Sequence, residues 1–312
     1  MSATRIIKQV TKNPRMLFAY LNATGLLNSV SDEKIIKLLW WVRFGEKLNV
    51  DSPKTFNEKI QWLKMYNHDP KLTMLVDKYA VREYIKGILG EEHLIPLYGV
   101  WSDPEQIDFE ELPDQFVLKC NHNAGVGLCI CRDKKKLDFQ HVKHELQKGL
   151  NNNFYYSSRE WAYKNVPRKI ICEKYMEDDS KKGLRDYKFF CFNGKAKFVY
   201  LSEGLENHKT ANISFYDLKG NEMPFRRKDY EPFSKKPVFP PNFNDLIAAA
   251  NLLAENLNLP FVRIDLYSIA NQVYFSEITC YPNSGYIPFD PEMWDAEIGK
   301  WIDLSSLKLS YK

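Results

Sequence analysis

Residues 261–286, FVRIDLYSIANQVYFSEITCYPNSGY, constrain the fold most, because they read as two β-strands joined by a tight turn. Apolar and polar residues alternate along both arms, as in a half-buried hairpin. With the tip near Asn271, Asp265 faces Glu277 across the two arms. Strict alternation also puts Phe275 on the same side of its arm as Glu277. Opposed side chains in such a pair lie roughly 5 Å apart, and like charges repel. The hairpin therefore needs a cation between its carboxylates, a shared proton or full solvation.

Two cations could meet this need. Arg263 lies two residues before Asp265 and would neutralise part of the charge, which leaves an ordinary solvated face with an Arg–Asp pair. Alternatively, the two carboxylates hold Mg²⁺, which takes oxygen ligands and is usually bound by one or two carboxylates plus substrate phosphates. The hairpin alone leaves both interpretations open.

The composition indicates an ordered globular protein with room for two or three subdomains. The chain has 312 residues, of which 44% are hydrophobic and 14% aromatic, and both values exclude a disordered chain. The net charge of +4 is mild, and the short basic clusters fall in predicted loops. We therefore do not expect a nucleic-acid-binding protein, which would carry a concentrated basic face.

The sequence predicts a cytoplasmic protein. No apolar run approaches the ~20 residues that span a bilayer, and the N-terminal segment does not resemble a signal peptide. The six cysteines lie mostly in predicted strands and form no paired CxxC motifs, which is typical of buried, reduced thiols.

The N-terminal segment has a basic side. Arg5, Lys8, Lys12 and Arg15 follow helical spacing beside apolar residues. Residues 1–20 could therefore contact a membrane surface or dock a partner complex. The alternative is an ordinary packing helix whose outer side is basic.

The order of elements changes from helices to strands along the chain. Residues 1–74 look helical, and Thr55 with Glu58 has the spacing of a capping box. Residues 115–131 then read as strand, glycine-rich loop and strand. No helix follows the loop, so neither a Walker nor a Rossmann motif fits. The loop is either an ordinary turn or a flap whose N–H groups close over phosphates.

Further strand and helix signals follow. Residues 168–176 form a buried type of strand, and residues 185–200 form a hairpin around an Asn193-Gly194 turn. An apolar stripe predicts a helix over residues 246–257.

Five segments resemble one known family. They are SPKTFNEKIQWLKMY, DKYAVREYI, FVLKCNHNAGVG, DYKFFCFNGK and FSEITCYPNSGY, and they are similar to the TupA-like ATP-grasp family of polysaccharide and teichuronopeptide biosynthesis. The resemblance implies an α+β ATP-grasp fold, in which two α+β subdomains clamp ATP, with a helical N-terminal extension. It implies a helical region over residues 1–74, the N-terminal ATP-grasp subdomains with the phosphate loop over 75–175, and the C-terminal subdomain with the metal-binding hairpin over 176–312.

The resemblance also implies an ATP site. In it, lysines and the glycine-rich loop contact the phosphates, Glu173 accepts from the adenine amino group, and an acidic residue, Asp178 or Asp179, holds the ribose. The expected ATP-binding residues are Lys78, Lys119, Gly125, Val126, Gly127, Glu173, Lys174, Tyr175, Met176, Asp179 and Lys188.

Catalytic, metal and substrate roles follow from the same resemblance. Arg263 and Lys119 would be catalytic, and Asp265 and Glu277 would hold Mg²⁺. The sequence departs from many ATP-grasp enzymes at Thr279, where they have Asn, and Asn283 could substitute for it. The candidate substrate contacts are Tyr281, Asn283, Ser284 and Tyr286.

The function that the resemblance implies is an ATP-grasp ligase acting in capsule or other surface-polysaccharide synthesis. With ATP and Mg²⁺, it would join a carboxylated saccharide to an amino acid or amine through an acyl phosphate. Three alternatives remain open. One is a kinase that phosphorylates a sugar hydroxyl, and another is a glycosyltransferase, although no Asp-x-Asp motif is present. The third is a nucleotide-binding scaffold without turnover.

Overall fold

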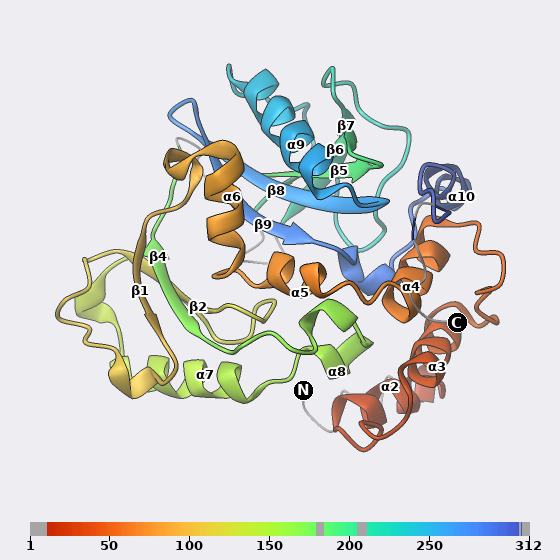
Figure 1. Cartoon of the computed structure of the whole chain (residues 1–312), viewed down its shortest axis with the longest axis horizontal. Coiled ribbons are helices and arrows are strands. Elements are labelled where there is room, and N and C mark those ends of the chain that lie inside the picture. Colours follow the sequence, from red (N-terminus) through yellow and green to blue (C-terminus); the bar gives the residue numbers. More distant parts are fainter. Residues whose placement is uncertain (1–10, 179–183, 205–210, 306, 308–312) are drawn as a thin grey trace.

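Two separate antiparallel β-sheets carry most of the fold in the computed structural model, which describes residues 11–178, 184–204, 211–305 and 307 (Figure 1). The strand orders are β1-β4-β2-β3 and β7-β6-β5-β8-β9. The first sheet contains β1 (Leu97–Trp101), β2 (Phe116–Cys120), β3 (Leu128–Cys131) and β4 (Ile170–Lys174). The second contains β5 (Asp186–Phe192), β6 (Lys195–Glu203), β7 (Asn212–Asp217), β8 (Phe261–Ile269) and β9 (Gln272–Thr279).

Helices surround both sheets and form the N-terminal extension. The α-helices are α2 (Met16–Ala23), α3 (Asp32–Phe44), α4 (Phe56–Tyr66), α5 (Pro70–Val76), α6 (Val81–Leu89), α7 (Phe139–Asn151), α8 (Tyr155–Ser158), α9 (Phe243–Leu257) and α10 (Met293–Gly299). Short 3₁₀ turns are η1 (Glu91–His93), η2 (Pro104–Gln106), η3 (Lys134–Lys136), η4 (Trp161–Tyr163) and η5 (Pro282–Gly285). The predicted capping box of Thr55 and Glu58 begins α4.

The first sheet packs one face on α7. Side chains alternate along a strand, so Phe116 and Leu118 of β2 point to the same face, where they form a core with Val142 and Leu146 of α7. Val117 and Lys119, which alternate with them along β2, point to the other face. The polar side chains of this sheet are thus directed away from α7, which lies along the lower edge of Figure 1.

The second sheet packs one face on α9, which covers it in Figure 1. On that side Phe189 of β5 stacks on Phe243, with ring centroids 6.3 Å apart. On the opposite side the neighbouring residue Phe190 stacks on Phe198 at 4.6 Å, within a large aromatic cluster. This cluster accounts for much of the high aromatic content, and it supports the polar residues further along the same face.

The β8–β9 hairpin has the predicted turn and pairing. Ala270 and Asn271 both have positive φ, at 49° and 63°, as a two-residue type I′ turn requires. Asp265 pairs with Glu277, as expected. The strict alternation along the second arm is wrong, however, because Leu266 pairs with Phe275 and the register shifts at that point. The bulge leaves one extra residue on β9, so Phe275 and Glu277 lie on opposite faces.

Helices α4, α5 and α6 pack into the core of the second sheet. Ile60, Leu75 and Ile85, one from each helix, belong to the same buried cluster as the residues of β5 and β8. The predicted division at residues 74/75 and 175/176 stays a prediction, and its second boundary falls between β4 and β5.

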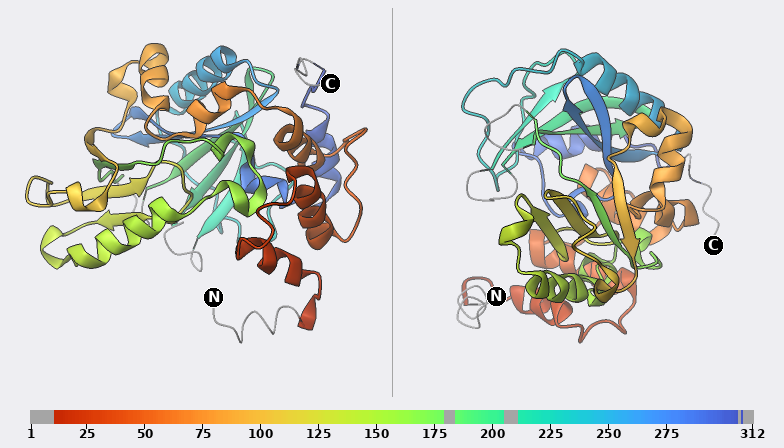
Figure 2. Two further views of the ribbon diagram at one scale, coloured as in Figure 1. Left: turned by 60° about the horizontal axis from the view of Figure 1, so that its bottom comes forward. Right: turned by 90° about the vertical axis from the view of Figure 1, so that its left-hand side faces the viewer.

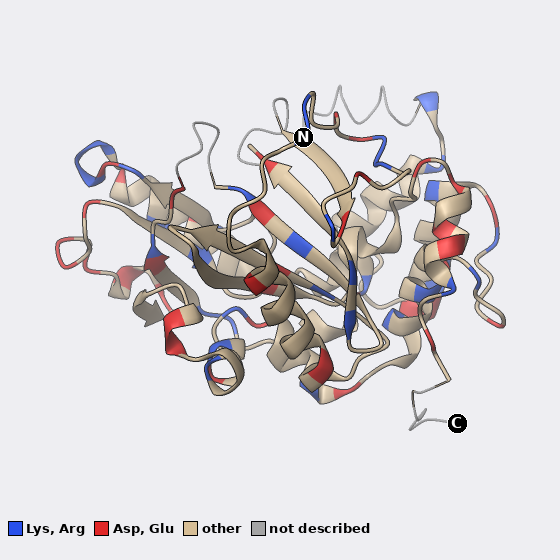
Figure 3. Cartoon of the chain, turned by 90° about the horizontal axis from the view of Figure 1, so that it is seen from above, with Lys and Arg blue, Asp and Glu red and all other residues tan. Residues whose placement is uncertain are grey.

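Helices α2 and α3 lie at the periphery, away from both sheets (Figure 2). They are tied to the rest by Arg159, whose guanidinium donates to the carbonyl of Leu27 at 2.8 Å and lies 3.5 Å from Asp32. Within the described ranges, no helix has the length and apolar character needed to cross a membrane. Basic and acidic segments are interspersed along the helices and strands in Figure 3.

Candidate active site

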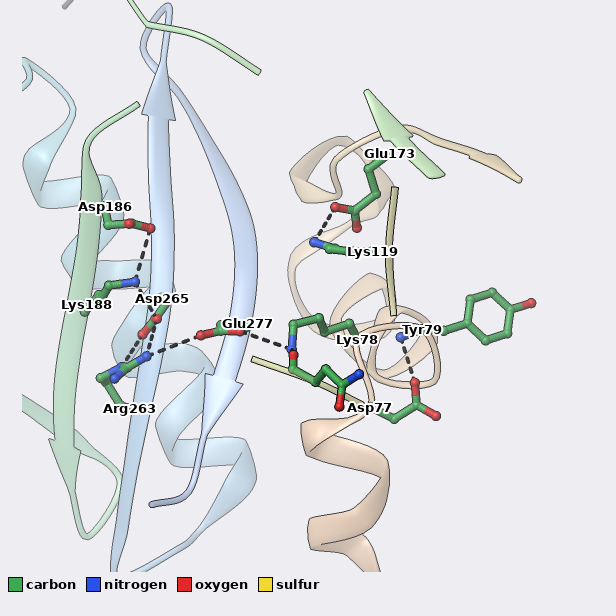
Figure 4. Close-up of polar contacts among 11 residues, drawn as sticks. Asp77, Lys78, Tyr79, Lys119, Glu173, Asp186, Lys188, Arg263, Asp265 and Glu277 are labelled. Carbon is green, nitrogen blue, oxygen red and sulfur yellow. Dashed lines mark hydrogen bonds and ion pairs between the residues drawn. The ribbon is translucent and has the colours of Figure 1, made fainter. Parts of the chain in front are cut away.

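One face of the second sheet carries a row of charged residues across three strands (Figure 4). Asp186 and Lys188 come from β5, Arg263 and Asp265 from β8, and Glu277 from β9. Residues two apart on a strand share a face, and the register pairs Lys188 with Asp265 and Asp265 with Glu277. The row is thus fixed by strand pairing rather than by loops.

Asp265 is the central acid of the row and is fully buried. Arg263 donates two hydrogen bonds to it, from Nε to Oδ1 at 2.7 Å and from Nη2 to Oδ2 at 2.6 Å. Lys188 Nζ donates to Oδ2 at 2.9 Å and also lies 3.2 Å from Asp186 Oδ1. A buried carboxylate requires such compensation, and here two cations supply it.

Glu277 ends the row and connects it to Lys78 on the opposite side of the site. Arg263 Nη2 approaches Oε1 at 3.3 Å, and Lys78 Nζ approaches Oε2 at 3.4 Å. Burial alone would raise the pKa of Glu277, but the charges of Lys78, Lys188, Arg263 and Lys119 more than offset it and lower the pKa to about 2. Glu277 is therefore ionised at neutral pH.

Lys78 connects the charged row to the glycine-rich loop. It lies between α5 and α6, and its Nζ donates to the carbonyl of Asn123 at 2.9 Å. Its backbone N–H donates to the carbonyl of Asn121 at 3.2 Å. The loop and the sheet face are thus held together by one lysine.

The glycine-rich loop has a fixed base and an exposed tip. Gly125 and Gly127 have φ of +83° and +70°, which favours glycine. A Cβ on Gly127 would lie 2.6 Å from Cys120 Sγ and 2.9 Å from the Cα of Gly149, whereas one on Gly125 meets no atom within 4 Å. Val126 at the tip is exposed, so a ligand can approach the tip while the base stays packed on α7.

Lys119 and Glu173 form an ion pair on the polar face of the first sheet. Lys119 Nζ lies 2.6 Å from Glu173 Oε2, and Arg82 Nη1 lies 3.4 Å from Oε1. Arg82 was missed by the sequence analysis. The signal that could have found it is its position one helical turn after Lys78, in the segment DKYAVREYI.

The chain leaves the first sheet after Lys174, the last residue of β4. Lys174 is exposed, and its backbone N–H donates to the carbonyl of Pro96 at 2.9 Å. Tyr175 and Met176 are half-buried, and the hydroxyl of Tyr175 accepts from Arg132 at 3.0 Å. Asp178 accepts from the backbone N–H of Arg185 at 3.0 Å. Asp179, the predicted ribose contact, lies outside the described residues.

The segment after β9 folds back toward α4. Asn283, Ser284 and Gly285 have successive φ values of 50°, 56° and 67°. Asn283 and Ser284 adopt this left-handed conformation at a steric cost, because each carries a Cβ atom. Asn283 is exposed, Ser284 and Tyr286 are half-buried, and Tyr281 is 3% exposed. Of the four predicted substrate contacts, Tyr281 thus lies in the core.

A buried polar cluster holds this segment, and the sequence analysis missed it. Gln61 Nε2 donates to the carbonyl of Gly285 at 2.7 Å, and Lys64 Nζ donates to that of Ser284 at 3.0 Å. The Ser284 hydroxyl donates to Glu160 Oε1 at 2.5 Å. Burial lowers the pKa of Lys64 to about 7, although the charge of Glu160 opposes this. The signal was the spacing i, i+4, i+7 of Asn57, Gln61 and Lys64, which places three polar residues on one helix face.

The carboxylates have the chemistry that Mg²⁺ requires. Asp265 and Glu277 are register partners with hard oxygen donors, and Glu277 stays ionised and partly accessible. Among the residues that the structure describes, no group of three or more His, Cys, Asp or Glu could hold a metal. A magnesium ion would here complete its ligands with phosphate oxygens and water.

Comparison with known proteins identifies one family. The family described as TupA-like ATPgrasp matches residues 58–303. No curated protein matches the chain. Among solved structures, D-alanine–D-alanine ligase from Bacillus anthracis has a TM-score of 0.38 and 16% identity, covering 67% of this chain and 58% of that one.

Two further solved structures give similar values. D-alanine–D-alanine ligase from Helicobacter pylori has a TM-score of 0.38 and 17% identity, covering 74% of this chain and 62% of that one. D-cycloserine synthetase DcsG has a TM-score of 0.41 and 16% identity, covering 74% of this chain and 71% of that one. The chain thus spans less than two thirds of the length of the two D-alanine–D-alanine ligases.

Proposed function

The chain belongs to the TupA-like ATP-grasp family, with its α+β ATP-grasp fold and a helical N-terminal extension, and from this premise we propose that it is an ATP-dependent carboxylate–amine ligase. The observation that carries the proposal is the row of charged residues on the second sheet. Its carboxylates lie beside the cations Lys188, Arg263 and Lys78, an arrangement suited to a metal–triphosphate complex.

ATP binds between the charged row and the first sheet. Lys78, Lys119 and Lys188 contact phosphates, for which a compact ammonium charge is suited. The tip of the glycine-rich loop, residues 124–126, closes over them with its backbone N–H groups. Glu173 and the backbone of residues 174–176 receive the adenine.

Asp265 and Glu277 would hold Mg²⁺, which when bound neutralises charge on the phosphoryl oxygens. The remaining charge falls to this chain's own residues. Arg263 is already fixed by its two bonds to Asp265, so it presents its charge without reorganising. Lys188 is fixed in the same way by Asp186 and Asp265.

The reaction has two balanced steps. A carboxylate oxygen of the acceptor attacks the γ-phosphorus, the bond to the β-phosphate oxygen breaks, and ADP leaves behind an acyl phosphate. The amine nitrogen then attacks the acyl carbon, the carbon–oxygen bond breaks, and phosphate departs while the amine loses a proton. The chain contributes positioning and charge stabilisation to both steps.

We propose that the acceptor is the uronic acid of a surface polysaccharide and that the amine is an amino acid or a related amine. The support for this class is the sequence resemblance to a family of polysaccharide biosynthesis. Asn283, which is exposed, and Ser284, which is half-buried, follow the charged row and are the acceptor contacts. Capsule synthesis in the cytoplasm is the setting that we propose for this reaction.

Product analysis tests this function. The purified protein is incubated with ATP, Mg²⁺, a panel of uronic-acid saccharides and hydroxylamine as the amine, alongside Glu277→Gln and the exposed control Glu222→Gln. Hydroxamate, ADP and phosphate, formed by the wild type and the control but not by Glu277→Gln, are the expected products. A stable phosphosugar with ADP would instead indicate a kinase. Transfer from a nucleotide sugar with no use of ATP would indicate a glycosyltransferase.

A further inference from the structure

Helix α2 is apolar but stays at the surface. Its sequence is MLFAYLNA, and Asn22 is the one residue of the eight that is buried. Leu17 is 47% exposed and Phe18 is 38% exposed. A surface helix of a globular protein normally turns a polar side to water. Helix α2 has no charged residue and exposes apolar side chains instead.

The exposed apolar surface extends from α2 to α3. Trp41 is 39% exposed, and its ring lies 6.0 Å from that of Phe18. Leu26, between the two helices, is 70% exposed. Leu17, Phe18, Leu26 and Trp41 are here called the α2–α3 edge. Single exposed apolar residues need no explanation, but a group of them marks an interaction surface.

The net charge of the chain lies in the part of the sequence that contains α2. Residues 1–31 contain Arg5, Lys8, Lys12 and Arg15 and no acidic residue, and the first acid is Asp32. The rest of the chain carries forty basic and forty acidic residues, so this segment accounts for the whole net charge of +4.

One described basic residue of this segment, Arg15, lies at the edge itself. Arg15 donates to the carbonyl of Trp41 at 3.2 Å, and its guanidinium lies 5.6 Å from the centre of the Trp41 ring. Lys12 is exposed. On α3, Lys37 pairs with Glu33 and adds no net charge there. Basic and apolar groups are therefore adjacent on one surface.

We propose that the α2–α3 edge docks the protein onto a membrane surface rich in anionic lipid. The apolar side chains enter the boundary between headgroups and acyl chains, and the positive charge of the N-terminal segment attracts the protein to anionic lipid. Trp41 is suited to that boundary because its ring is apolar and its N–H is polar. This inference does not depend on the proposed ligase activity.

Charge favours a membrane over a second copy of the chain. Two copies that met through this edge would bring two segments of charge +4 together, and like charges repel. An anionic lipid surface attracts the same segment. Self-association is therefore an alternative outcome of the test rather than the proposal.

Sedimentation with lipid vesicles tests the inference on the full chain. We expect binding to vesicles of phosphatidylcholine mixed with phosphatidylglycerol, weak binding to pure phosphatidylcholine, and loss of binding at high salt. The double variant Leu17→Ser, Phe18→Ser should lower binding by about tenfold or more. The control Leu252→Ser removes an equally exposed leucine from α9 and should bind as the wild type does.

Two charge-reversal variants, a test and a control, isolate the electrostatic contribution to vesicle binding. Lys8→Glu with Lys12→Glu should weaken binding to anionic vesicles alone, and the control Lys235→Glu with Lys236→Glu, which carries the same charge change in an exposed loop, should not. Unfolding midpoints of all variants should match the wild type. The inference is overturned if the wild type does not sediment with anionic vesicles. It is also overturned if the leucine–phenylalanine variant abolishes a concentration-dependent dimer while vesicle binding is unchanged.

Discussion

Arg263 is the residue on which the geometry of the charged row depends. Its guanidinium contacts Asp265 twice and reaches Glu277 with the same Nη2 atom. The planar fork of arginine matches a carboxylate with two parallel bonds, and lysine cannot reproduce this. Charge alone is therefore not sufficient at this position.

Replacing Arg263 with Lys should lower kcat in the hydroxamate assay by about 10²-fold, the magnitude seen on removing one charge-stabilising donor. The affinity for ATP should change less, because Lys78, Lys119 and Lys188 remain. Steady-state kinetics with ATP and the uronic-acid acceptor measures both. A lowered affinity for ATP with unchanged kcat would mean that Arg263 only binds the nucleotide.

Lys64 acts at a distance from the phosphates, through the segment after β9. Lys64→Met should leave ATP affinity unchanged and raise the KM for the acceptor, because the carbonyl of Ser284 loses one of its two donors and keeps only Gln61 Nε2. We also expect a loss of about 1.5–3 kcal/mol of stability from the lost hydrogen bond to a charged donor. Lys59→Met on the same helix is the matched control, since Lys59 donates to the carbonyl of Ile302 instead. Equal effects of both variants on acceptor KM would contradict this role.

At the scale of elements, the glycine-rich loop depends on its contact with α7. Gly127→Ala should lower the free energy of unfolding by about 1–2 kcal/mol from its left-handed φ alone. The clash with Gly149 adds to this. Gly125→Ala has a similar cost from its positive φ, but its Cβ would meet no atom within 4 Å. The Gly125→Ala variant should therefore lose less stability than Gly127→Ala. Denaturant titrations compare the two, and equal midpoints would show that the packing of the loop base is unimportant.

The contact between α4 and α10 predicts a pH dependence. Burial raises the pKa of Asp295 to about 7, and Asn57 Nδ2 donates to its Oδ1 at 2.7 Å. The folded state thus favours the protonated acid, so this contribution to stability is fully present below about pH 4 and is lost as the pH rises through about 7.

Asp295→Asn should therefore stabilise the fold at pH 8, by as much as about 4 kcal/mol for a shift of about three units, and have little effect at pH 4. Unfolding titrations of both proteins at the two pH values measure the difference. An equal change at both would mean that titration of Asp295 does not affect folding.

Local patterns predicted the elements well and the irregular connections poorly. The β8–β9 pairing of Asp265 with Glu277 follows from alternation and a two-residue turn, and both are local. The bulge beside Phe275 does not follow from local patterns, because the strand register beyond Asp265 depends on how both strands pack against the rest of the fold. Similarly, Gln61 and Lys64 have polar spacing on one helix face, but their partners at Ser284 and Gly285 lie more than 200 residues away.

At the scale of the whole molecule, the site joins parts that are distant in sequence. Lys78, from the segment between α5 and α6, contacts both Glu277 of the second sheet and Asn123 of the loop. The charge of Lys119, from the first sheet, also lowers the pKa of Glu277. The family resemblance predicted this convergence, whereas spacing alone could not, because each contact depends on how the two sheets are packed.

Titration calorimetry with ATP tests the central claim, that these residues form one Mg²⁺-dependent ATP site. The wild type and the control Glu222→Gln should bind ATP at one site with Mg²⁺ and much more weakly without it. Glu277→Gln and Lys119→Met should each weaken binding by about tenfold or more, a loss of about 1.4 kcal/mol per factor of ten. Absence of ATP binding by the wild type, or equal affinities in all four proteins, would contradict the account.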